Sequence, residues 1–376
     1  MRVSILGPAY PLRGGIAHHV YWLWRELINR GHTVQVVSFR KLYPSIFFPG
    51  TTQLDTSRLK LDAHALPTLT PLNPATWLRA FKQVKAFAPD VIVFQWWQPF
   101  FGPLVGTLAR LFRKAGFKCI IECHNVLSHE GSPLDGLLAK FALSTADRLI
   151  THSTKDRNDL LAIVPGKEVT ITSLPFLDEF SGPSARGRGG RTILFFGNVR
   201  KHKGLDVLLA AMPKVLLKVE CNLIIVGEFY DSIDKYQRLI REHRIESHVH
   251  LDNRYVPNEQ VQGIFQKADV LVLPYLSATQ SAVARIALSS GLPVIASRTG
   301  GLSEAVRENV TGLLFPPGDP NALAGQIVNY FTNSLGPTFS ENILKTSSED
   351  SQRQVGNVIE AIILRAVSHS RVPTLY

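Results

Sequence analysis

Short runs of apolar residues alternate with longer amphipathic stretches along nearly the whole chain. Runs that are apolar on both faces and separated by helices are typical of buried parallel strands, so the pattern predicts doubly wound α/β sheets. In the first half the expected strands are Val3–Leu6, Thr33–Phe39, Val91–Gln95, Cys119–Glu122, Arg148–His152 and Val169–Ser173. The expected helices between them are Gly15–Asn29, Pro74–Phe87, Pro103–Lys114 and Ser132–Thr145.

A single stretch, 181–190, breaks this alternation with Gly, Ser and Arg in place of periodic apolar residues, which is typical of a linker. The alternation then resumes. Strands are expected at Thr192–Gly197, Asn222–Val226, His248–Leu251, Val270–Pro274, Pro293–Ser297 and Gly312–Phe315. Helices are expected at Leu205–Val219, Asn258–Lys267, Ser281–Ser290 and Val355–Val367.

A length of 376 residues suits two domains of this kind. We predict a Rossmann-like N-terminal domain over 1–180, the linker over 181–190 and a C-terminal domain over 191–350. A helix within 351–376 is expected to pack back on the N-terminal domain. Because ligands of doubly wound sheets bind at the carboxyl ends of the strands, the deepest cleft is expected between the two domains.

Composition narrows the cellular setting. No apolar run approaches the roughly 20 residues that span a bilayer, and the N-terminus lacks the pattern of a signal peptide. The three cysteines, Cys119, Cys123 and Cys221, lie in or beside apolar strands, which favours buried thiols in a reducing cytoplasm. Metal binding by Cys119, Cys123 and His124 is the alternative, but no second ligand pair accompanies them. We therefore expect no metal.

The net charge of +11 is concentrated in the first half of the chain. Residues 1–175 hold 20 Lys and Arg against 11 Asp and Glu, whereas the remainder holds 21 against 19. Nucleic acid, an anionic membrane or an anionic substrate would each explain this excess. Because zinc-finger spacing, aromatic RNA-binding motifs and basic helices are absent from the sequence, we favour a membrane or an anionic acceptor.

Two loops after expected strands have the residues of anion sites. The first contains Gly14 and Gly15 just before a helix, where paired glycines let a ligand approach free backbone N–H groups. The second runs from Gly197 to Gly204 and holds Arg200, Lys201, His202 and Lys203 before a helix. Cations at the positive end of a helix dipole are unfavourable unless an anion joins them, and a diphosphate would do so. A tight turn and a solvated basic loop are the plainer interpretations.

The spacing Gly197-x-x-Arg200-x-x-Lys203-Gly204 resembles the donor-phosphate motif of family-4 retaining glycosyltransferases, the group 1 type with the GT-B fold. Further segments agree with that family in order along residues 1 to about 330. They are Gly14–Gly15, His124–Asn125, Ile225–Glu228, Ala268–Pro274, Gly291–Ile295, Gly300–Glu304 and Thr311–Asp319. The resemblance implies a hexosyltransferase that takes a sugar from a nucleoside diphosphate sugar and retains its anomeric configuration.

The resemblance also implies residue roles. Arg200 and Lys203 would hold the donor pyrophosphate and stabilise the departing nucleoside diphosphate, a form of electrostatic catalysis that requires neither metal nor other cofactor. His124 would contact the transferred sugar, and Gly15 would approach the phosphates. The implied donor-binding set is Gly14, Gly15, Gly197, Arg200, Lys203, Gly204, Glu228, Thr279, Gln280, Ser281 and Ala282.

This sequence departs from the family pattern at two positions. The usual pair of glutamates, which touch the sugar and the ribose, is replaced by Ala278 and Ile286. Thr279 or Gln280 would take over the sugar contact, and Arg285 lies next to the ribose position. The nucleotide base, UDP or GDP, and the sugar therefore stay open.

Acceptor recognition is expected in the N-terminal domain. Aromatic residues after a strand, Trp96 and Trp97, form a platform for a sugar or lipid, with core packing as the alternative. The apolar stretch Tyr43–Pro49 beside Arg40 and Lys41 suits contact with a membrane. The remaining candidates are His18, His129 and Glu130.

Three functions compete at this point. The first is a glycosyltransferase that acts in the cytoplasm, as a monomer or homodimer at the inner membrane face, on a glycan, lipid-linked or small-molecule hydroxyl. The second is a catalytically silent protein that binds nucleotide sugars. The third is another two-domain nucleotide-sugar enzyme, such as an epimerase. The missing glutamates favour the second, and the ordered set of motifs favours the first.

Overall fold

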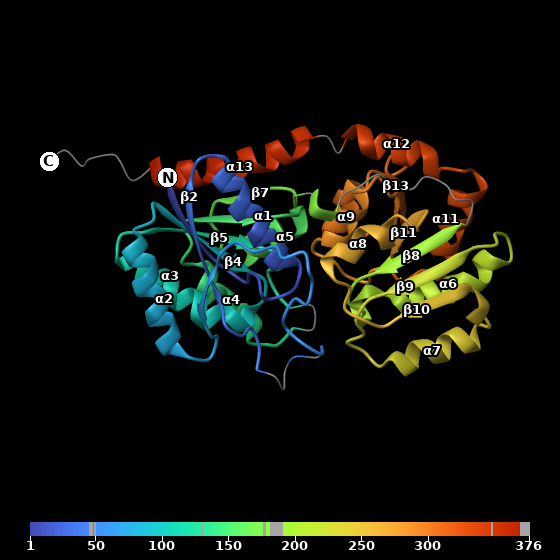
Figure 1. Ribbon diagram of the computed structural model, residues 1–376, viewed down its shortest axis with the longest axis horizontal. Coiled ribbons are helices and arrows are strands. Elements are labelled where there is room, and N and C mark those ends of the chain that lie inside the picture. Colours follow the sequence, from blue (N-terminus) through green and yellow to red (C-terminus); the bar gives the residue numbers. More distant parts are fainter. Residues whose placement is uncertain are drawn as a thin grey trace. The chain divides into compact units, whose positions relative to one another are not determined.

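The computed structural model describes residues 1–44, 48, 50–128, 131–175, 178–180, 191–346 and 349–368. The chain divides into two compact units (Figure 1). One comprises Met1–Asp55, Lys60–Pro175 and Gln352–Tyr376, and the other comprises Thr56–Leu59 and Phe176–Ser351. The predicted linker at 181–190 lies outside the described residues.

The first unit is built on a parallel sheet of seven strands in the order β3-β2-β1-β4-β5-β6-β7. The strands are β1 (Arg2–Leu6), β2 (Thr33–Phe39), β3 (Leu66–Leu69), β4 (Val91–Trp96), β5 (Lys118–Cys123), β6 (Arg148–Thr151) and β7 (Val169–Ile171). The order reverses direction between β1 and β4, which is where doubly wound sheets place their ligands. The predicted fold class is therefore confirmed in this unit.

Helices cover both faces of this sheet. They are α1 (Gly15–Asn29), α2 (Pro74–Phe87), α3 (Gly102–Lys114), α4 (Asp135–Leu143) and α5 (Thr154–Ile163), with a 3₁₀ turn η2 (Pro99–Phe101). Alternate strand residues point to opposite faces. Ile92, Phe94 and Trp96 of β4 join a core with α2, α3 and α4, so Gln95 projects to the other face. This alternation decides which side chains reach the site described below.

The second unit contains a parallel sheet of six strands in the order β10-β9-β8-β11-β12-β13. The strands are β8 (Thr192–Phe196), β9 (Asn222–Val226), β10 (Val249–Asp252), β11 (Val270–Leu273), β12 (Val294–Ser297) and β13 (Gly312–Phe315). The helices are α6 (Leu205–Leu216), α7 (Ile233–Glu242), α8 (Asn258–Phe265), α9 (Ala282–Ser289), α10 (Gly300–Ala305), α11 (Pro320–Thr332) and α12 (Gly336–Thr346). The short turns are η3 (Asp178–Phe180), η4 (Lys201–Lys203) and η5 (Glu246–His248). β8 and β11 are neighbours at the switch in strand order.

A short segment from the first half of the sequence belongs to this second unit. The backbone N–H of Arg58 donates to the carboxylate of Glu259 at 3.1 Å, and the N–H of Asn258 donates to Oγ of Ser57 at 2.8 Å. Residues 56–59 thus accept from one of the first N–H groups of α8, which have no partners within the helix, and bind the carboxylate of Glu259 in its first turn.

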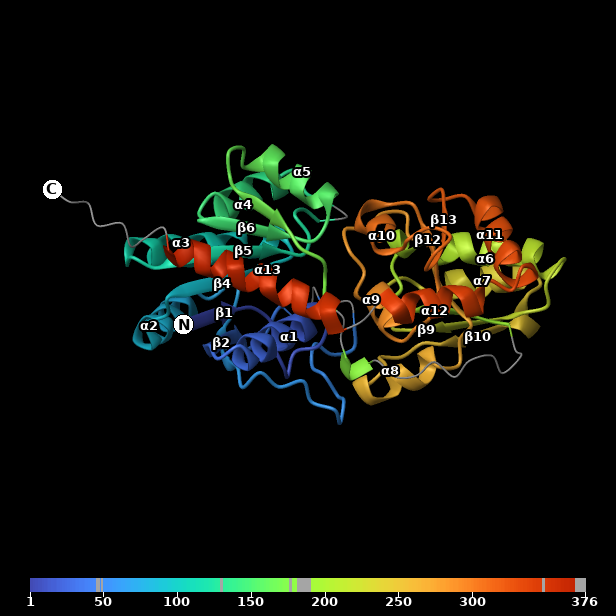
Figure 2. The ribbon, with the colours of Figure 1, turned by 90° about the horizontal axis from the view of Figure 1, so that it is seen from above.

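The last helix, α13 (Glu349–Ser368), runs alongside α1 in both views (Figures 1 and 2). Arg30 and His32, which follow α1, bind the two carboxylate oxygens of Glu360 at 2.8 and 3.0 Å. Gly356 allows the close approach, because a Cβ there would lie 2.3 Å from Oε1 of Glu26. The contacts that α13 makes with Arg30 and His32 therefore lie at the amino-terminal ends of β1 and β2. This is the edge of the sheet opposite the one where the candidate site residues gather.

Candidate active site

The basic loop of the second unit leaves β8 at Gly197, which has a φ of 109°. The N–H of Val199 donates to the carbonyl of Glu228 at 2.9 Å, so the loops after β8 and β9 are tied together. The guanidinium of Arg200 lies 4.7 Å from the ring centre of Tyr230, and Nζ of Lys203 lies 3.8 Å from that of Tyr275. Aromatic faces thus hold both cations in the loop that leads into α6.

Gly204 connects this loop to α6 in a left-handed conformation, with a φ of 65°. A Cβ at this position would lie 2.0 Å from the carbonyl oxygen of Pro274. The N–H of Leu276 donates to the carbonyl of His202 at 2.8 Å. The loops after β8 and β11 are therefore held in direct backbone contact, and only glycine fits between them.

The loop after β11 leads into α9, whose N-cap is Ser281. Its hydroxyl accepts a hydrogen bond from the N–H of Ala284 at 3.2 Å. The N–H of Gly301 donates to the carbonyl of Thr279 at 2.8 Å, and a Cβ at Gly300 would lie 1.8 Å from the carbonyl oxygen of Ala278. The structure therefore brings the residues of the implied donor set that belong to this unit to one edge of the sheet. They are Gly197, Arg200, Lys203, Gly204, Glu228, Thr279, Gln280, Ser281 and Ala282.

The two positions that lack glutamates are apolar and buried. Ala278 and Ile286 are 6% and 7% exposed. Beside Ile286, burial lowers the pKa of the Arg285 guanidinium to about 10. This side of the loop thus holds a desolvated cation next to Ile286, one of the two positions where the family resemblance implies a glutamate.

In the first unit, α1 begins at the paired glycines. Gly14 has a φ of 119° and is the N-cap of α1, and both glycines are exposed. The first turn of the helix contains no acidic residue, so its N–H groups and positive dipole are not offset by a carboxylate of its own.

Four side chains gather around Glu122 near the carboxyl ends of β4, β5 and β6. They are Gln95, His124 and His152, which follow or end these strands, and His19 of α1. Nε2 of His19 contacts Oε1 of Glu122 at 2.9 Å, and Nε2 of Gln95 donates to Oε2 at 2.8 Å. Nε2 of His124 lies 2.6 Å from Oε1 of Gln95. Nδ1 of His152 contacts the carbonyl of Thr172 at 3.1 Å, and its Nε2 lies 3.5 Å from Glu122. We call these five residues the Glu122 cluster.

Burial and charge set the protonation of this cluster. Glu122 is 0% exposed, and Gln95, His19 and His152 are nearly so. Burial alone would raise the pKa of Glu122, but the imidazoles of His19, His152 and His124 hold that pKa well below its usual range. The pKa of His124 is lowered by burial and by repulsion from His19 and His152. An ionised carboxylate and a neutral His124 follow for neutral pH.

The sequence analysis did not single out His19, Gln95, Glu122 or His152. The signal was present in the strand alternation: Gln95 and Glu122 are polar residues inside otherwise apolar strands, and they share the face that α1 covers. A buried polar residue in such a strand requires a partner.

His19, His124 and His152 each have one ring nitrogen that lies within 4.8 Å of the chosen nitrogens of the other two. Three histidines at such distances are candidates for binding a metal ion. Tetrahedral zinc with bonds of about 2.0–2.1 Å brings its ligand atoms to about 3.4 Å from one another. Each imidazole also already uses one nitrogen toward Glu122, Gln95 or Thr172. Each ring also has a second nitrogen that can face another partner, so a hydrogen-bonded network and a metal site are the two alternatives for these histidines, and metal analysis of the purified protein distinguishes them.

The structure corrects the predicted aromatic platform. Trp96 is 0% exposed and donates from Nε1 to the carbonyl of Val126 at 3.2 Å. Trp97 is 9% exposed, and its Nε1 donates to the hydroxyl of Tyr43 at 3.1 Å. Both rings belong to the core between the sheet and α3, where the apolar area of an indole contributes most. They are not available to stack on a ligand.

The other acceptor candidates have different outcomes. His18 lies outside the Glu122 cluster; burial lowers its pKa to about 4, although Asp55 opposes this shift. His129 and Glu130 lie outside the described residues, as does most of the apolar half of the Tyr43–Pro49 stretch.

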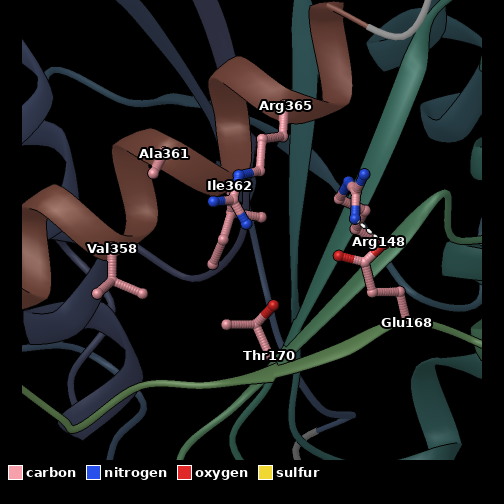
Figure 3. A pocket seen from close by; sticks show the side chains of 7 residues that line it. All are labelled: Arg148, Glu168, Thr170, Val358, Ala361, Ile362 and Arg365. Atoms are coloured by element: carbon pink, nitrogen blue, oxygen red, sulfur yellow. Dashed lines mark ion pairs between the residues drawn. The ribbon is translucent and has the colours of Figure 1, made fainter.

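A small pocket of about 160 Å³ opens elsewhere in the first unit, between β6, β7 and α13 (Figure 3). Arg148 forms an ion pair with Glu168 on one wall, and Val358, Ile362 and Arg365 of α13 form the other. We assign it to incomplete packing of α13 against the sheet, away from the Glu122 cluster.

Two family models match the chain and together cover most of it. The model described as "Glycosyl transferase 4-like domain" matches residues 14–175, and the model described as "Glycosyl transferases group 1" matches residues 190–333. The first match includes the paired glycines and the Glu122 cluster, and the second includes the basic loop.

Among curated relatives, the chain is 24% identical to the phosphatidylinositol N-acetylglucosaminyltransferase gpi3 subunit of Schizosaccharomyces pombe, over 89% of this chain and 74% of that protein. It is 30% identical to D-inositol 3-phosphate glycosyltransferase of Corynebacterium aurimucosum, over 48% of this chain and less than half, 44%, of that protein. The solved structure of Anabaena Alr3699/HepE with UDP superposes with a TM-score of 0.73 at 17% identity, over 96% of this chain and 100% of that chain.

Proposed function

The chain belongs to the group 1 glycosyltransferases of the GT-B fold, and from this premise we propose that it transfers a hexose from a nucleoside diphosphate sugar to a hydroxyl acceptor with retention of configuration. The observation that carries the proposal is the pair of cations, Arg200 and Lys203, each held against an aromatic ring in the loop that leads directly into α6.

A diphosphate suits this loop for three reasons. Two cations stand at the positive end of a helix dipole, where an anion relieves their repulsion. The first N–H groups of a helix lack partners within it and donate to phosphate oxygens. The aromatic contacts at 4.7 and 3.8 Å restrict both side chains before the ligand binds. The same cations would stabilise the charge that develops on the leaving nucleoside diphosphate, which is electrostatic catalysis without a required metal.

For the nucleotide base and the sugar of the donor, the proposal names a class and not a single compound. UDP and UDP-glucose are bound in structures of Anabaena Alr3699/HepE, so we propose a uridine or guanosine diphosphate sugar as donor. With Ala278 and Ile286 in place of glutamates, polar contacts to the sugar would come from Thr279, Gln280 and the amides that begin α9. His124 would contact the transferred sugar from the Glu122 cluster.

The acceptor is proposed to be a glycan, a lipid-linked sugar or a small polyol. The name of the Schizosaccharomyces pombe relative includes a phosphoinositide, which favours a lipid-linked acceptor. None of the helices in the described parts of the chain is both long and apolar enough to cross a bilayer. From the name of that relative we propose contact of this chain with a membrane surface.

Helix α4 carries a surface that suits this contact. Leu134, Leu137 and Phe141 are 61%, 66% and 39% exposed, and their spacing places them on one face of the helix. The guanidinium of Arg110 lies 3.8 Å from the ring centre of Phe141, and Lys140 is exposed on the same helix. Apolar side chains beside cations are typical of proteins that bind anionic bilayers at the interface.

The phosphate role is tested with Arg200→Ala and Lys203→Ala. Each is expected to lower kcat by about 100- to 1000-fold, the cost of removing one charge-stabilising group from a transition state. Turnover is measured as release of nucleoside diphosphate from a panel of UDP- and GDP-sugars. Lys218→Ala is the control, since it removes an exposed cation close to the opposite end of α6.

Unchanged turnover in Arg200→Ala, with the fold intact by circular dichroism, would refute this assignment. A wild-type protein that binds donors in calorimetry but neither transfers nor hydrolyses them would instead establish the silent binding protein.

A further inference from the structure

The Glu122 cluster contains more buried polar and ionisable side chains than contact with a sugar requires. A carboxylate with 0% exposure is costly to bury unless its charge is compensated. Here it lies between His19 of α1, Gln95 of β4 and His152 after β6, and none of these three side chains belongs to the donor loop. The groups that face His124 are Gln95 by hydrogen bond and His19, His152 and Glu122 by charge.

The directions of the hydrogen bonds can be assigned from Glu122 outward. An ionised carboxylate only accepts, so the amide nitrogen of Gln95 must be the group that faces Oε2 of Glu122 at 2.8 Å. The amide oxygen of Gln95 then faces Nε2 of His124 at 2.6 Å. Because an amide oxygen only accepts, Nε2 of His124 must carry a proton.

A neutral His124 with its proton on Nε2 has a lone pair on Nδ1. This tautomer presents an acceptor, and not a donor, to a hydroxyl group. His152 has the opposite arrangement, because its Nδ1 faces the carbonyl of Thr172 at 3.1 Å and must donate to it. His124 and His152 therefore have different tautomers, because each faces an oxygen that can only accept, one at Nε2 and the other at Nδ1.

The position of Gln95 is itself built into the fold. Gly7 follows β1 directly, and a Cβ there would lie 2.6 Å from Cγ of Gln95. A larger residue would displace the amide from between Glu122 and His124. The N–H of His124 also donates to the carbonyl of Trp96 at 2.8 Å, which fixes the backbone that carries the imidazole.

We propose that Glu122 is a positioning residue that acts through Gln95 to hold His124 as the neutral tautomer protonated on Nε2, so that Nδ1 accepts a hydrogen bond from a hydroxyl of the bound sugar. His19 completes the arrangement by donating from Nε2 to the other oxygen of Glu122. The statement about the sugar rests on the proposed function, whereas the tautomer does not.

The tautomer is measured first in the wild-type protein. Two-bond ¹H–¹⁵N correlation spectra of histidine-labelled protein distinguish protonated from unprotonated ring nitrogens, and the His124 signals are identified by their loss in His124→Asn. We expect His124 to be protonated on Nε2 alone between about pH 6 and pH 8, since its pKa is lowered. A His124 protonated on Nδ1, or on both nitrogens, would overturn the proposal without any variant having to fold.

Two variants then interrupt the chain of hydrogen bonds that runs from Glu122 through Gln95 to His124. Glu122→Gln replaces a carboxylate that can only accept by an amide that can also donate, so it no longer fixes which way Gln95 is turned. Gln95→Leu removes the link to His124. In both variants we expect His124 to be able to take either neutral tautomer. We also expect kcat to fall by about 10- to 100-fold, as it does when an orienting partner is removed from other sites, with KM for the donor little changed. Glu168→Gln, at an exposed glutamate of the same unit that pairs with Arg148, is the control.

The outcomes separate the two proposals. Unaltered tautomer and kcat in both variants would show that Glu122 does not act through Gln95. Full turnover in His124→Ala, with the wild-type tautomer as expected, would refute the sugar contact and leave the positioning intact. One equivalent of tightly bound zinc in the purified protein would replace the network by a metal site and overturn the proposal.

Discussion

Single backbone positions set the geometry of the basic loop, from Gly197 to Gly204, more strictly than its charged side chains do. Gly204 joins two loops from neighbouring strands and has no room for a side chain, whereas Lys203 beside it reaches its place by lying on an aromatic ring. The motif spacing in the sequence could indicate the charges. The contact with Pro274 depends on the adjacency of β8 and β11, which follows only from the folded sheet.

Gly204→Ala is expected to destabilise the second unit by about 2 kcal/mol or more, because it combines a left-handed φ with a Cβ 2.0 Å from a carbonyl oxygen. Gly263→Ala is the matched control. Gly263 lies inside α8, where an added Cβ meets no described atom within 4 Å, and alanine favours helix by up to about 1 kcal/mol.

The five tryptophans provide a clean readout of this comparison. They are Trp22, Trp24, Trp77, Trp96 and Trp97, and all lie in the first unit. Urea unfolding of Gly204→Ala should therefore show an earlier transition by circular dichroism but little change by tryptophan fluorescence. No loss in either signal would contradict the assigned strain, whereas an equal loss in both would show that the two units unfold together.

At the level of helices and strands, the apolar alternation predicted most of the sheet. The expected strand Thr33–Phe39 is confirmed as β2 and the expected helix Gly15–Asn29 as α1. The strand β3 was missed, because Leu66–Leu69 is short, contains Pro67 and lies at a sheet edge where proline is tolerated. The wrong expectation for Trp96 came from treating an aromatic pair as exposed without using its position in the strand.

Helix α13 depends on a carboxylate for its contact with α1. Burial would raise the pKa of Glu360, but hydrogen bonds and charge interactions with Arg30 and His32 hold it below the usual range. A carboxylate with a depressed pKa contributes stability above its unfolded pKa of about 4.3, and this contribution is lost as pH falls through the folded pKa. Acidification should therefore loosen α13.

Hydrogen exchange of the α13 amides, corrected for intrinsic rates, measures this effect between about pH 6 and pH 3. In Glu360→Gln, exchange should already be faster at pH 6 and should vary less with pH. Glu341→Gln on α12, whose partner Lys345 is exposed, should leave the α13 profile unchanged. An unaltered profile in Glu360→Gln would mean that the apolar contacts alone hold the helix.

At the scale of the whole molecule, the excess of positive charge and the basic loop lie in different parts of the chain. Residues 1–175, with 20 Lys and Arg against 11 Asp and Glu, carry the apolar face of α4, and the nearly balanced remainder carries the basic loop. A long-range attraction to an anionic surface thus acts on the unit that is proposed to meet the acceptor. Such attraction is screened by salt, whereas burial of leucine in the interface is not.

Binding to vesicles separates these two contributions. Sedimentation with phosphatidylcholine vesicles that contain phosphatidylglycerol should show binding that weakens from 0.05 to 0.5 M salt, and pure phosphatidylcholine should bind less. The double variant Leu134→Ser, Leu137→Ser should weaken binding at every salt concentration by about tenfold or more, since each leucine loses part of the 1.5–3 kcal/mol of full burial. Leu217→Ser, which removes an 85% exposed leucine from the other unit, should not. Equal binding of the double variant and the wild type would exclude α4 as the membrane contact and leave the stretch Tyr43–Pro49 as the remaining candidate.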